Sequence, residues 1–142
     1  MSEQENIRIA EKSLNSINTR TLEQTDDLFA DDYTTDGPGA PGLTLEKSRA
    51  NTQVYLEAFP DLRFEVLRRI AQGDYVVLDW VATGTNTGPM RTPAGNTIPA
   101  TGTKGTIYGS TTYEIKDGKI VHSWTYWDRV AMLEQMGLMQ PM

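Results

Sequence analysis

The first third of the chain has the residue spacing of helices. Apolar residues recur three or four positions apart and so fall on one helix face: Ile7, Ala10, Leu14 and Ile17. Ser2 followed by Glu5 has the spacing of a capping box at the start of this helix. A second short helix is expected after Thr21, and a third over residues 44–59, which Pro60 ends.

Beyond Pro60 the pattern changes to that of strands. Residues 63–70 show a weak alternation of the strand type, and residues 75–85 are rich in β-branched and aromatic side chains. Residues 104–116 and 119–128 form a further pair, joined by Asp-Gly, which is a strong signal for a two-residue hairpin. Helices followed by antiparallel strands predict an α+β fold and exclude alternating βαβ units.

The segment 88–103 interrupts this order. It is dense in glycine, proline and threonine, which predicts a long irregular excursion. Loops of that length in compact domains are often lids or binding loops, but a mobile arm or an oligomer contact fits the composition equally well. The sequence leaves these interpretations open.

The composition narrows the class of protein. A chain of 142 residues suits one domain, residues 1–142. The lack of cysteine excludes disulfides and thiol nucleophiles, and a single histidine excludes a multi-histidine metal site, so we expect neither metal nor cofactor.

The charge and hydropathy also limit the expected partners and location. A net charge of −6 makes nucleic acid and anionic membrane surfaces poor partners. The charged N-terminus lacks the apolar core of a signal peptide, and no run of residues is apolar enough to span a membrane. We therefore expect a cytoplasmic protein.

The hairpin places chemically interesting side chains on one face. A regular two-residue turn pairs Tyr113 with His122, and side chains alternate between faces along each strand. The more apolar face, expected to point inward, then carries Ile107, Thr111, Tyr113, Ile115, Ile120, His122, Trp124, Tyr126 and Asp128. Ser123, Thr125 and Trp127 fall on the opposite face, and a shift of one residue in register would exchange the two sets.

This predicted face suggests acid/base chemistry. Burial among aromatic side chains would raise the pKa of the Asp128 carboxyl, so that it can take a proton from carbon and return one to oxygen. We predict Asp128 as general acid/base and His122 as its partner or as an oxyanion donor. Two other interpretations stay open: Asp128 is a favoured N-cap for the last helix, and His122 can be an ordinary core or surface histidine.

A pocket near these residues would be lined by aromatic side chains and one amide. The candidates for binding a small hydrophobic organic ligand are Tyr33, Tyr55, Phe59, Trp80, Asn86, Tyr113, Trp124 and Tyr126. Tyr55, Phe59, Trp124 and Tyr126 can also serve only in the core.

Several short motifs, taken in order, resemble one known family. They are Ala58-Phe59-Pro60-Asp61-Leu62, Gly73-Asp74 followed by Val76-Val77, Gly84-Thr85-Asn86-Thr87-Gly88, Asp117-Gly118-Lys119-Ile120-Val121, and Trp124 with Asp128 before Leu133-Glu134-Gln135-Met136-Gly137-Leu138. Their order and spacing from about Asp26 onward resemble the SnoaL-like polyketide cyclases, also called ester cyclases. Asn86 and His122 depart from the family pattern, which has histidine and glutamate at these positions.

The resemblance implies a fold, a reaction and an assembly. The fold would be the cone-shaped curved sheet shared with nuclear transport factor-like proteins and ketosteroid isomerases. The aspartate at the position of Asp128 would act as general acid/base in a cofactor-free aldol closure of a polyketide ring. The outer face of the sheet would form a homodimer or homotetramer.

Three functions therefore compete at this stage. The first is a cyclase or isomerase that acts on a small apolar carbonyl compound through Asp128. The second is a related hydroxylase or hydrolase, in which Asp128 and an inward-facing Asp79 would activate water. The third is a non-catalytic protein that holds a ligand while Asp128 caps the last helix.

Overall fold

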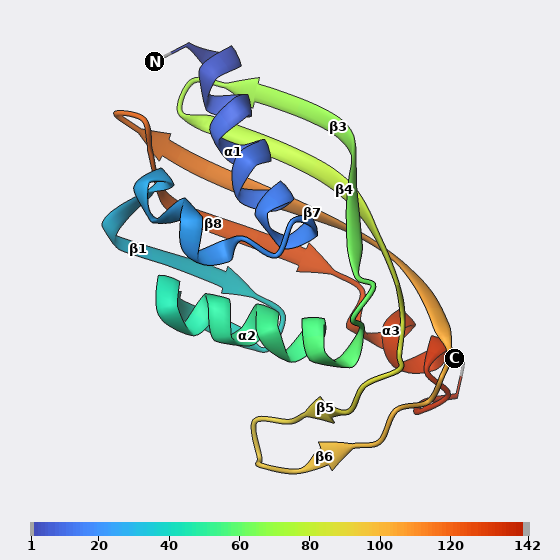
Figure 1. The fold of residues 1–142 in the computed structure, drawn as a ribbon. Coiled ribbons are helices and arrows are strands. Elements are labelled where there is room, and N and C mark those ends of the chain that lie inside the picture. Colours follow the sequence, from blue (N-terminus) through green and yellow to red (C-terminus); the bar gives the residue numbers. More distant parts are fainter. Residues whose placement is uncertain (1, 141–142) are drawn as a thin grey trace.

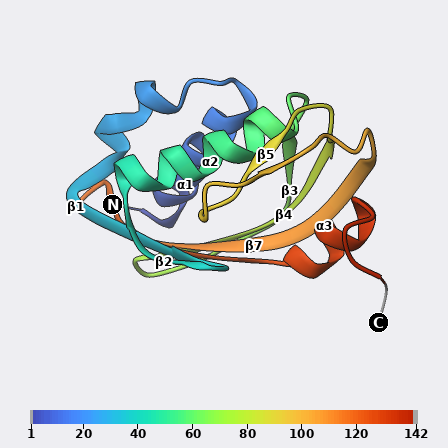
Figure 2. The same cartoon turned by 90° about the horizontal axis from the view of Figure 1, so that it is seen from below.

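The computed structural model describes residues 2–140, and its main feature is one curved sheet with helices on its concave side. Figure 1 shows helices α1 (Glu3–Asn18) and α2 (Leu45–Ala58) lying across the sheet, with the short helix α3 (Arg129–Gln135) at one end. Seen from below, the sheet bends around these helices (Figure 2). The predicted α+β cone is confirmed.

The helix starts are where the sequence predicted them. The hydroxyl of Ser2 accepts a hydrogen bond from the backbone N–H of Glu5, at 3.1 Å, and Thr44 accepts one from Lys47 in the same way. The expected second helix is a 3-10 helix, η1 (Leu22–Leu28), and its N-cap residue makes no side-chain capping bond. Short polar residues thus satisfy the free N–H groups of the two long helices.

Six strands form the sheet in the order β2-β1-β8-β7-β4-β3. Their bounds are β1 (Phe29–Gly37), β2 (Ala40–Thr44), β3 (Arg63–Gln72), β4 (Tyr75–Thr85), β7 (Lys104–Lys116) and β8 (Lys119–Trp127). All neighbours are antiparallel except β1 and β8, which run parallel. The N-terminal strand β1 therefore brings residues from the start of the chain beside the C-terminal strand.

The hairpin between β7 and β8 begins as predicted and then departs from the prediction. Lys116 pairs with Lys119 and Ile115 with Ile120, but Glu114 pairs with His122, so Val121 has no opposite residue. This is a β-bulge, and the extra residue moves the following side chains to the other face. The predicted pairing of Tyr113 with His122 is wrong: Tyr113 pairs with Ser123.

The bulge reverses the predicted faces over most of β8. Ser123 is buried on the concave side, whereas Tyr126 is 67% exposed on the convex side. Ile120 precedes the bulge and is fully buried, as predicted. The assignment of His122, Trp124 and Tyr126 to the interior is therefore wrong, while that of Tyr113 is confirmed.

The segment 88–103 forms a small hairpin beside α2. Strands β5 (Met90–Arg91) and β6 (Thr97–Ile98) pair with each other, and Met90 packs into a buried cluster with Ala58 and Phe59. Figure 1 shows this hairpin below α2 in the view. Whether it acts as a lid or as an oligomer contact stays a prediction.

Candidate functional site

A cavity of about 270 Å³ lies between the concave face of the sheet and helix α2. Its apolar walls come from all the helices, the sheet and the loops: Leu14, Ile17, Leu22, Phe29, Leu43, Leu45, Phe59, Leu62, Phe64, Trp80, Ala82, Ile107, Trp127, Met132 and Met136. Mostly apolar walls with a few placed polar groups are the usual make-up of a small-molecule site.

One group of hydroxyls in the cavity wall joins β1 to β8. Thr35 donates to the backbone carbonyl of Ser123 at 2.9 Å, so its oxygen accepts from the Ser123 hydroxyl at 2.7 Å. Since each hydroxyl has one hydrogen, Tyr33 must donate to Ser123, at 2.8 Å. The oxygen of Tyr33 is left with acceptor capacity.

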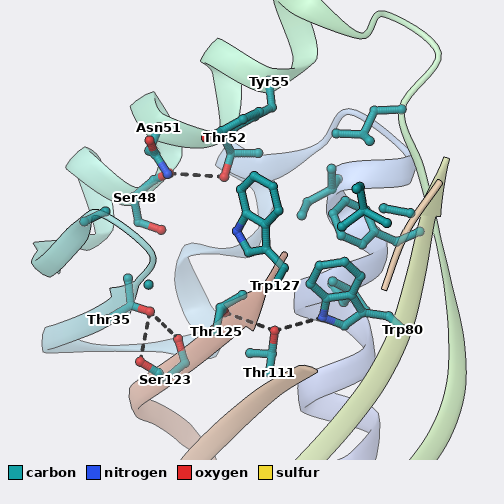
Figure 3. Close-up of a pocket in the computed structure, with 18 of the residues that line it drawn as sticks. Thr35, Ser48, Asn51, Thr52, Tyr55, Trp80, Thr111, Ser123, Thr125 and Trp127 are labelled. Carbon is teal, nitrogen blue, oxygen red and sulfur yellow. Dashed lines mark hydrogen bonds between the residues drawn. The ribbon is translucent and has the colours of Figure 1, made fainter. Parts of the chain in front are cut away.

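A second group crosses from β4 to β8. The indole N–H of Trp80 donates to the hydroxyl of Thr111 at 3.1 Å, and Thr111 lies 3.0 Å from the hydroxyl of Thr125. Figure 3 shows this row beside the Thr35 and Ser123 hydroxyls. The sheet therefore offers the cavity a line of fixed hydroxyls rather than a carboxylate.

Helix α2 contributes a polar face of its own. Ser48, Asn51, Thr52 and Tyr55 line the cavity at helical spacing. Trp127 lies opposite them, and its ring meets the ring of Tyr55 edge to face, with centroids 5.5 Å apart (Figure 3).

The indole of Trp127 is the clearest unused donor in the cavity. Its N–H donates to no oxygen among residues 2–140, and its partly buried ring lines the cavity. This N–H is therefore free to donate to an oxygen of a bound molecule.

Burial also sets the protonation of the cavity tyrosines. Desolvation raises the pKa of Tyr33, Tyr55 and Tyr113 above the ordinary value. These phenols stay neutral at physiological pH. The hydrogen of Tyr33 is already donated to Ser123, which leaves Tyr55 and Tyr113 to donate hydrogen bonds to a developing negative charge on oxygen.

Five of the predicted substrate-binding residues line the cavity: Tyr33, Tyr55, Phe59, Trp80 and Tyr113. Trp124 and Tyr126 do not line it, because the bulge turns both outward. Asn86 is also outside the cavity. It is fully buried, and its amide binds the backbone of Ala58, Gly88 and Thr101, so it holds the start of the 88–103 segment in place.

His122 lies on the convex face rather than in the interior. Its Nε2 is 3.0 Å from Asp36 Oδ2, its Nδ1 is 2.8 Å from the hydroxyl of Thr34, and its ring packs on Trp124. Asp36 contributes to the rim of the cavity, but its carboxylate is directed to His122 and to the N–H of Gly42. The predicted contact of His122 with Asp128 is absent between the described residues.

Asp128 adopts the capping role that the sequence had left open. Its Oδ1 accepts a hydrogen bond from the N–H of Ala131 at 2.8 Å, which caps α3. The residue is exposed and does not line the cavity, although the preceding Trp127 does. Its Oδ2 has no hydrogen-bond partner among residues 2–140.

The aspartate pair expected for a hydroxylase does not form. Asp79 lies on the convex face of β4 and binds Arg68, with 2.8 Å between Oδ2 and Nε. Since Asp128 also lies outside the cavity, the two carboxylates do not meet in it.

Sequence reasoning missed the residues that β8 and α2 present to the cavity. Ser123, Thr125 and Trp127 were assigned to the outer face because the bulge was not foreseen. The polar face of α2 did leave a signal, since small polar residues recur at 48, 51 and 52 on the helix face that carries Tyr55.

Two other features are absent from residues 2–140. No three or more histidine, aspartate or glutamate side chains gather as a metal site there. None of the described helices has the length and apolar character needed to cross a membrane.

Comparison with known proteins relates this fold and cavity to one family. The family model described as SnoaL-like polyketide cyclase matches residues 7–136. A search of curated proteins found no match.

Solved structures show the same fold. IdmH from Streptomyces antibioticus, a candidate polyketide cyclase, has 26% identity and a TM-score of 0.79, over 93% of this chain and 98% of that chain. AclR from Streptomyces galilaeus, a candidate hydroxylase, has 20% identity and a TM-score of 0.84, and the match covers 99% of this chain and 86% of that chain. A candidate SnoaL-like polyketide cyclase from Jannaschia sp. CCS1 has 19% identity and a TM-score of 0.84, and the match covers 98% of this chain and 95% of that chain.

Proposed function

The chain belongs to the SnoaL-like polyketide cyclase family, and we propose that it is a cofactor-independent enzyme that closes or isomerises a small, mostly apolar carbonyl compound in its cavity. One observation supports the ligand class above all. The cavity joins apolar walls to a fixed line of hydroxyls and to the free indole N–H of Trp127. Such a site suits a ring-sized molecule with carbonyl or hydroxyl oxygens.

The proposed reaction is an intramolecular aldol closure. A base removes a proton from the carbon beside one carbonyl, the resulting enolate carbon attacks a second carbonyl carbon, and the new alkoxide takes up a proton. No atoms are gained or lost in this step. The cavity would fold the substrate so that the two carbons meet, and neutral hydroxyl and indole donors would stabilise the enolate oxygen.

Asp128 is the group that we propose to carry the proton. It follows Trp127 directly, and the α3 cap uses only one of its two carboxylate oxygens. The second oxygen would have to turn toward the substrate at the end of β8. A carboxylate that serves a cap and a reaction together makes a specific experiment possible, because asparagine is an equally good N-cap and cannot act as a base.

A non-catalytic binding function is the second candidate. It is favoured by the exposure of Asp128 and by its bond to Ala131, since the cavity then contains no carboxylate free to act. In that case the same hydroxyls and Trp127 would only hold the ligand.

The two functions differ in what Asp128→Asn does. An aromatic triketone built for six-membered ring closure is incubated with the protein, and the product of equal mass, or lighter by one water, is followed by chromatography and mass spectrometry. We expect the wild type to form this product. Asp128→Asn should lose about 10²-fold or more of the rate while its melting temperature stays unchanged.

Two tryptophan variants serve as the matched pair. Trp127→Phe should weaken binding of the triketone in calorimetry, whereas Trp124→Phe, on the opposite face of the same strand, should not. Closure that continues in Asp128→Asn would remove Asp128 from the mechanism. Tight binding without any closure in the wild type would favour the non-catalytic function.

A further inference from the structure

Arg49 introduces a positive charge at the cavity. It is the only lysine or arginine among the described residues that line the cavity, and its side chain is 21% exposed. It comes from α2, directly after Ser48, the first residue of the polar face that meets Trp127. A half-buried guanidinium facing a mostly apolar cavity is unusual, because burial of a charge is costly unless a partner compensates it.

The contacts of Arg49 within the chain use only part of its bonding capacity. Nη1 binds the carboxylate of Asp26, and Nη2 donates to the hydroxyl of Thr25 at 3.2 Å. The guanidinium also lies over the ring of Phe29, 5.9 Å from its centroid. A guanidinium carries five N–H donors, so three are left without a partner among residues 2–140.

The charge of Arg49 is only weakly compensated inside the cavity. The side chain of Asp26 is 73% exposed, so water screens its negative charge. The other carboxylate near the cavity, Asp36, is directed to His122 and Gly42. Burial has the largest effect on the pKa of Tyr33 and raises it, whereas the charge of the Arg49 guanidinium acts to lower it. The positive charge of Arg49 therefore acts on a hydroxyl of the cavity.

A purely structural role for Arg49, as a link between α2 and η1, does not account for its unused donors and its place at the cavity. The bond to Asp26 does link α2 to η1, and two donors are sufficient for that. This link does not explain why the guanidinium lies over Phe29 in the cavity wall with three unused donors. A positive charge at the cavity also stands out in a protein whose net charge is −6. A fork of N–H donors beside an apolar cavity has the geometry that recognises a carboxylate.

We propose that the ligand of this cavity is an apolar carbonyl compound that bears a carboxylate, and that Arg49 binds this carboxylate. The proposal rests on the proposed function only in using the same cavity, and it does not depend on whether ring closure occurs. Arg49 would be a specificity residue that selects an acid over its neutral analogue.

The test uses two probes of almost equal shape. 2-Naphthoate and 2-acetylnaphthalene share a ring system and a carbonyl, and they differ in carrying a carboxylate oxygen or a methyl group. Isothermal titration calorimetry measures the affinity of each for the wild type, Arg49→Gln, Asp26→Asn and Arg68→Gln. Arg68 is the control, because it lies in an exposed ion pair with Asp79 on the convex face.

We expect three results together. Arg49→Gln should weaken naphthoate binding about tenfold or more and change acetylnaphthalene binding by less than about twofold. Asp26→Asn should strengthen naphthoate binding about threefold, because it frees a donor and removes the competing negative charge. Arg68→Gln should leave both affinities unchanged.

Asp26→Asn keeps the test decisive if Arg49→Gln fails to fold. A purely structural role for Arg49 predicts weaker or unchanged naphthoate binding in Asp26→Asn, and either result would overturn the proposal. Equal effects of Arg49→Gln on both probes would also overturn it, while leaving the cavity as a binding site. If neither probe binds the wild type, both the carboxylate proposal and the proposed ligand class fail.

Discussion

The two faces of strand β8 differ more than their sequence suggests. The inner face presents Ser123, Thr125 and Trp127 to the cavity, and the outer face presents a row of large side chains, His122, Trp124 and Tyr126. By apolar character alone the second set would be the one to bury. The first set is inside because its small hydroxyls bond to β1 and β7 and leave room for a ligand.

A single residue decides which set faces the cavity. Val121 is the bulged residue, so Ile120 and Ser123 point the same way although three positions separate them. Were Val121 paired with Glu114 instead, regular alternation would bring the aromatic set inward. The register beyond the bulge is therefore a functional part of the fold, and it is the first feature to break.

Insertion of one alanine after His122 should have the largest effect. The inserted residue would stand opposite Tyr113, so Trp124 and Tyr126 would either turn inward, where the cavity now lies, or lose their pairing with β7. Either outcome costs a large part of the roughly 5–15 kcal/mol that stabilises a typical domain, so we expect no cooperative unfolding transition in circular dichroism. Deletion of Val121 is the matched control, because it keeps every later side chain on its present face, and this variant should unfold cooperatively. An insertion variant that melts like the wild type would contradict this account of β8.

Two tryptophans on opposite faces give a finer test. Trp80 is 4% exposed and bonded to Thr111, so Trp80→Ala should cost about 3–5 kcal/mol of unfolding free energy. Trp124 is partly exposed on the outer face, and Trp124→Ala should cost about 1 kcal/mol. Urea denaturation measures both, and equal costs would mean that the faces are misassigned.

The outer face is also where we propose that a second copy of the chain packs. Tyr126 and Tyr108 are 67% and 65% exposed there, and exposed aromatic residues of this kind favour interfaces. Sedimentation velocity of the wild type should show a dimer or tetramer. Tyr126→Glu should weaken the association about tenfold or more, whereas Val130→Glu, on α3, should not. A monomeric wild type at high micromolar concentration would rule this proposal out.

The smallest expected effect is a pH dependence on the outer face. The N–H of Gly42, and after it the hydrogen bond to His122, holds the pKa of Asp36 below its ordinary value. A lowered pKa in the fold means that the stabilisation is present above the unfolded pKa of about 4 and is lost as pH falls through the folded value.

The melting temperature between pH 2 and 6 tests this contribution. The wild type should lose stability more steeply below about pH 4 than Asp36→Asn does. Asp31→Asn is the control on the same strand, since the Asp31 carboxylate has no hydrogen bond among residues 2–140. Identical slopes for the wild type and Asp36→Asn would show that the pair with His122 contributes nothing.

Local signals in the sequence were enough to predict most elements. Ser2, Thr44 and Asp128 cap helices as short polar residues do, and Asp117-Gly118 turns the hairpin with both residues at positive φ. These features depend on a few neighbouring residues. The α+β cone followed from their order.

The inner surface of the cavity was harder to predict. The position of a bulge depends on how both faces of the sheet pack, and the sequence of β8 contains no turn or glycine at Val121 to mark it. Arg49 was missed because its role depends on three separate segments, α2, η1 and β1, meeting around the same space. The spacing of neighbouring residues does not predict contacts between segments that are distant in the sequence.

The most direct test of the central claim follows the indole N–H signals by nuclear magnetic resonance. The chain has three tryptophans, so a ¹⁵N-labelled sample gives three indole signals, which Trp→Phe variants assign. On titration with 2-acetylnaphthalene, we predict that the Trp127 signal shifts most, that of Trp80 shifts less and that of Trp124 stays in place. A shift of the Trp124 signal with Trp127 unmoved would place the ligand on the outer face and contradict the account.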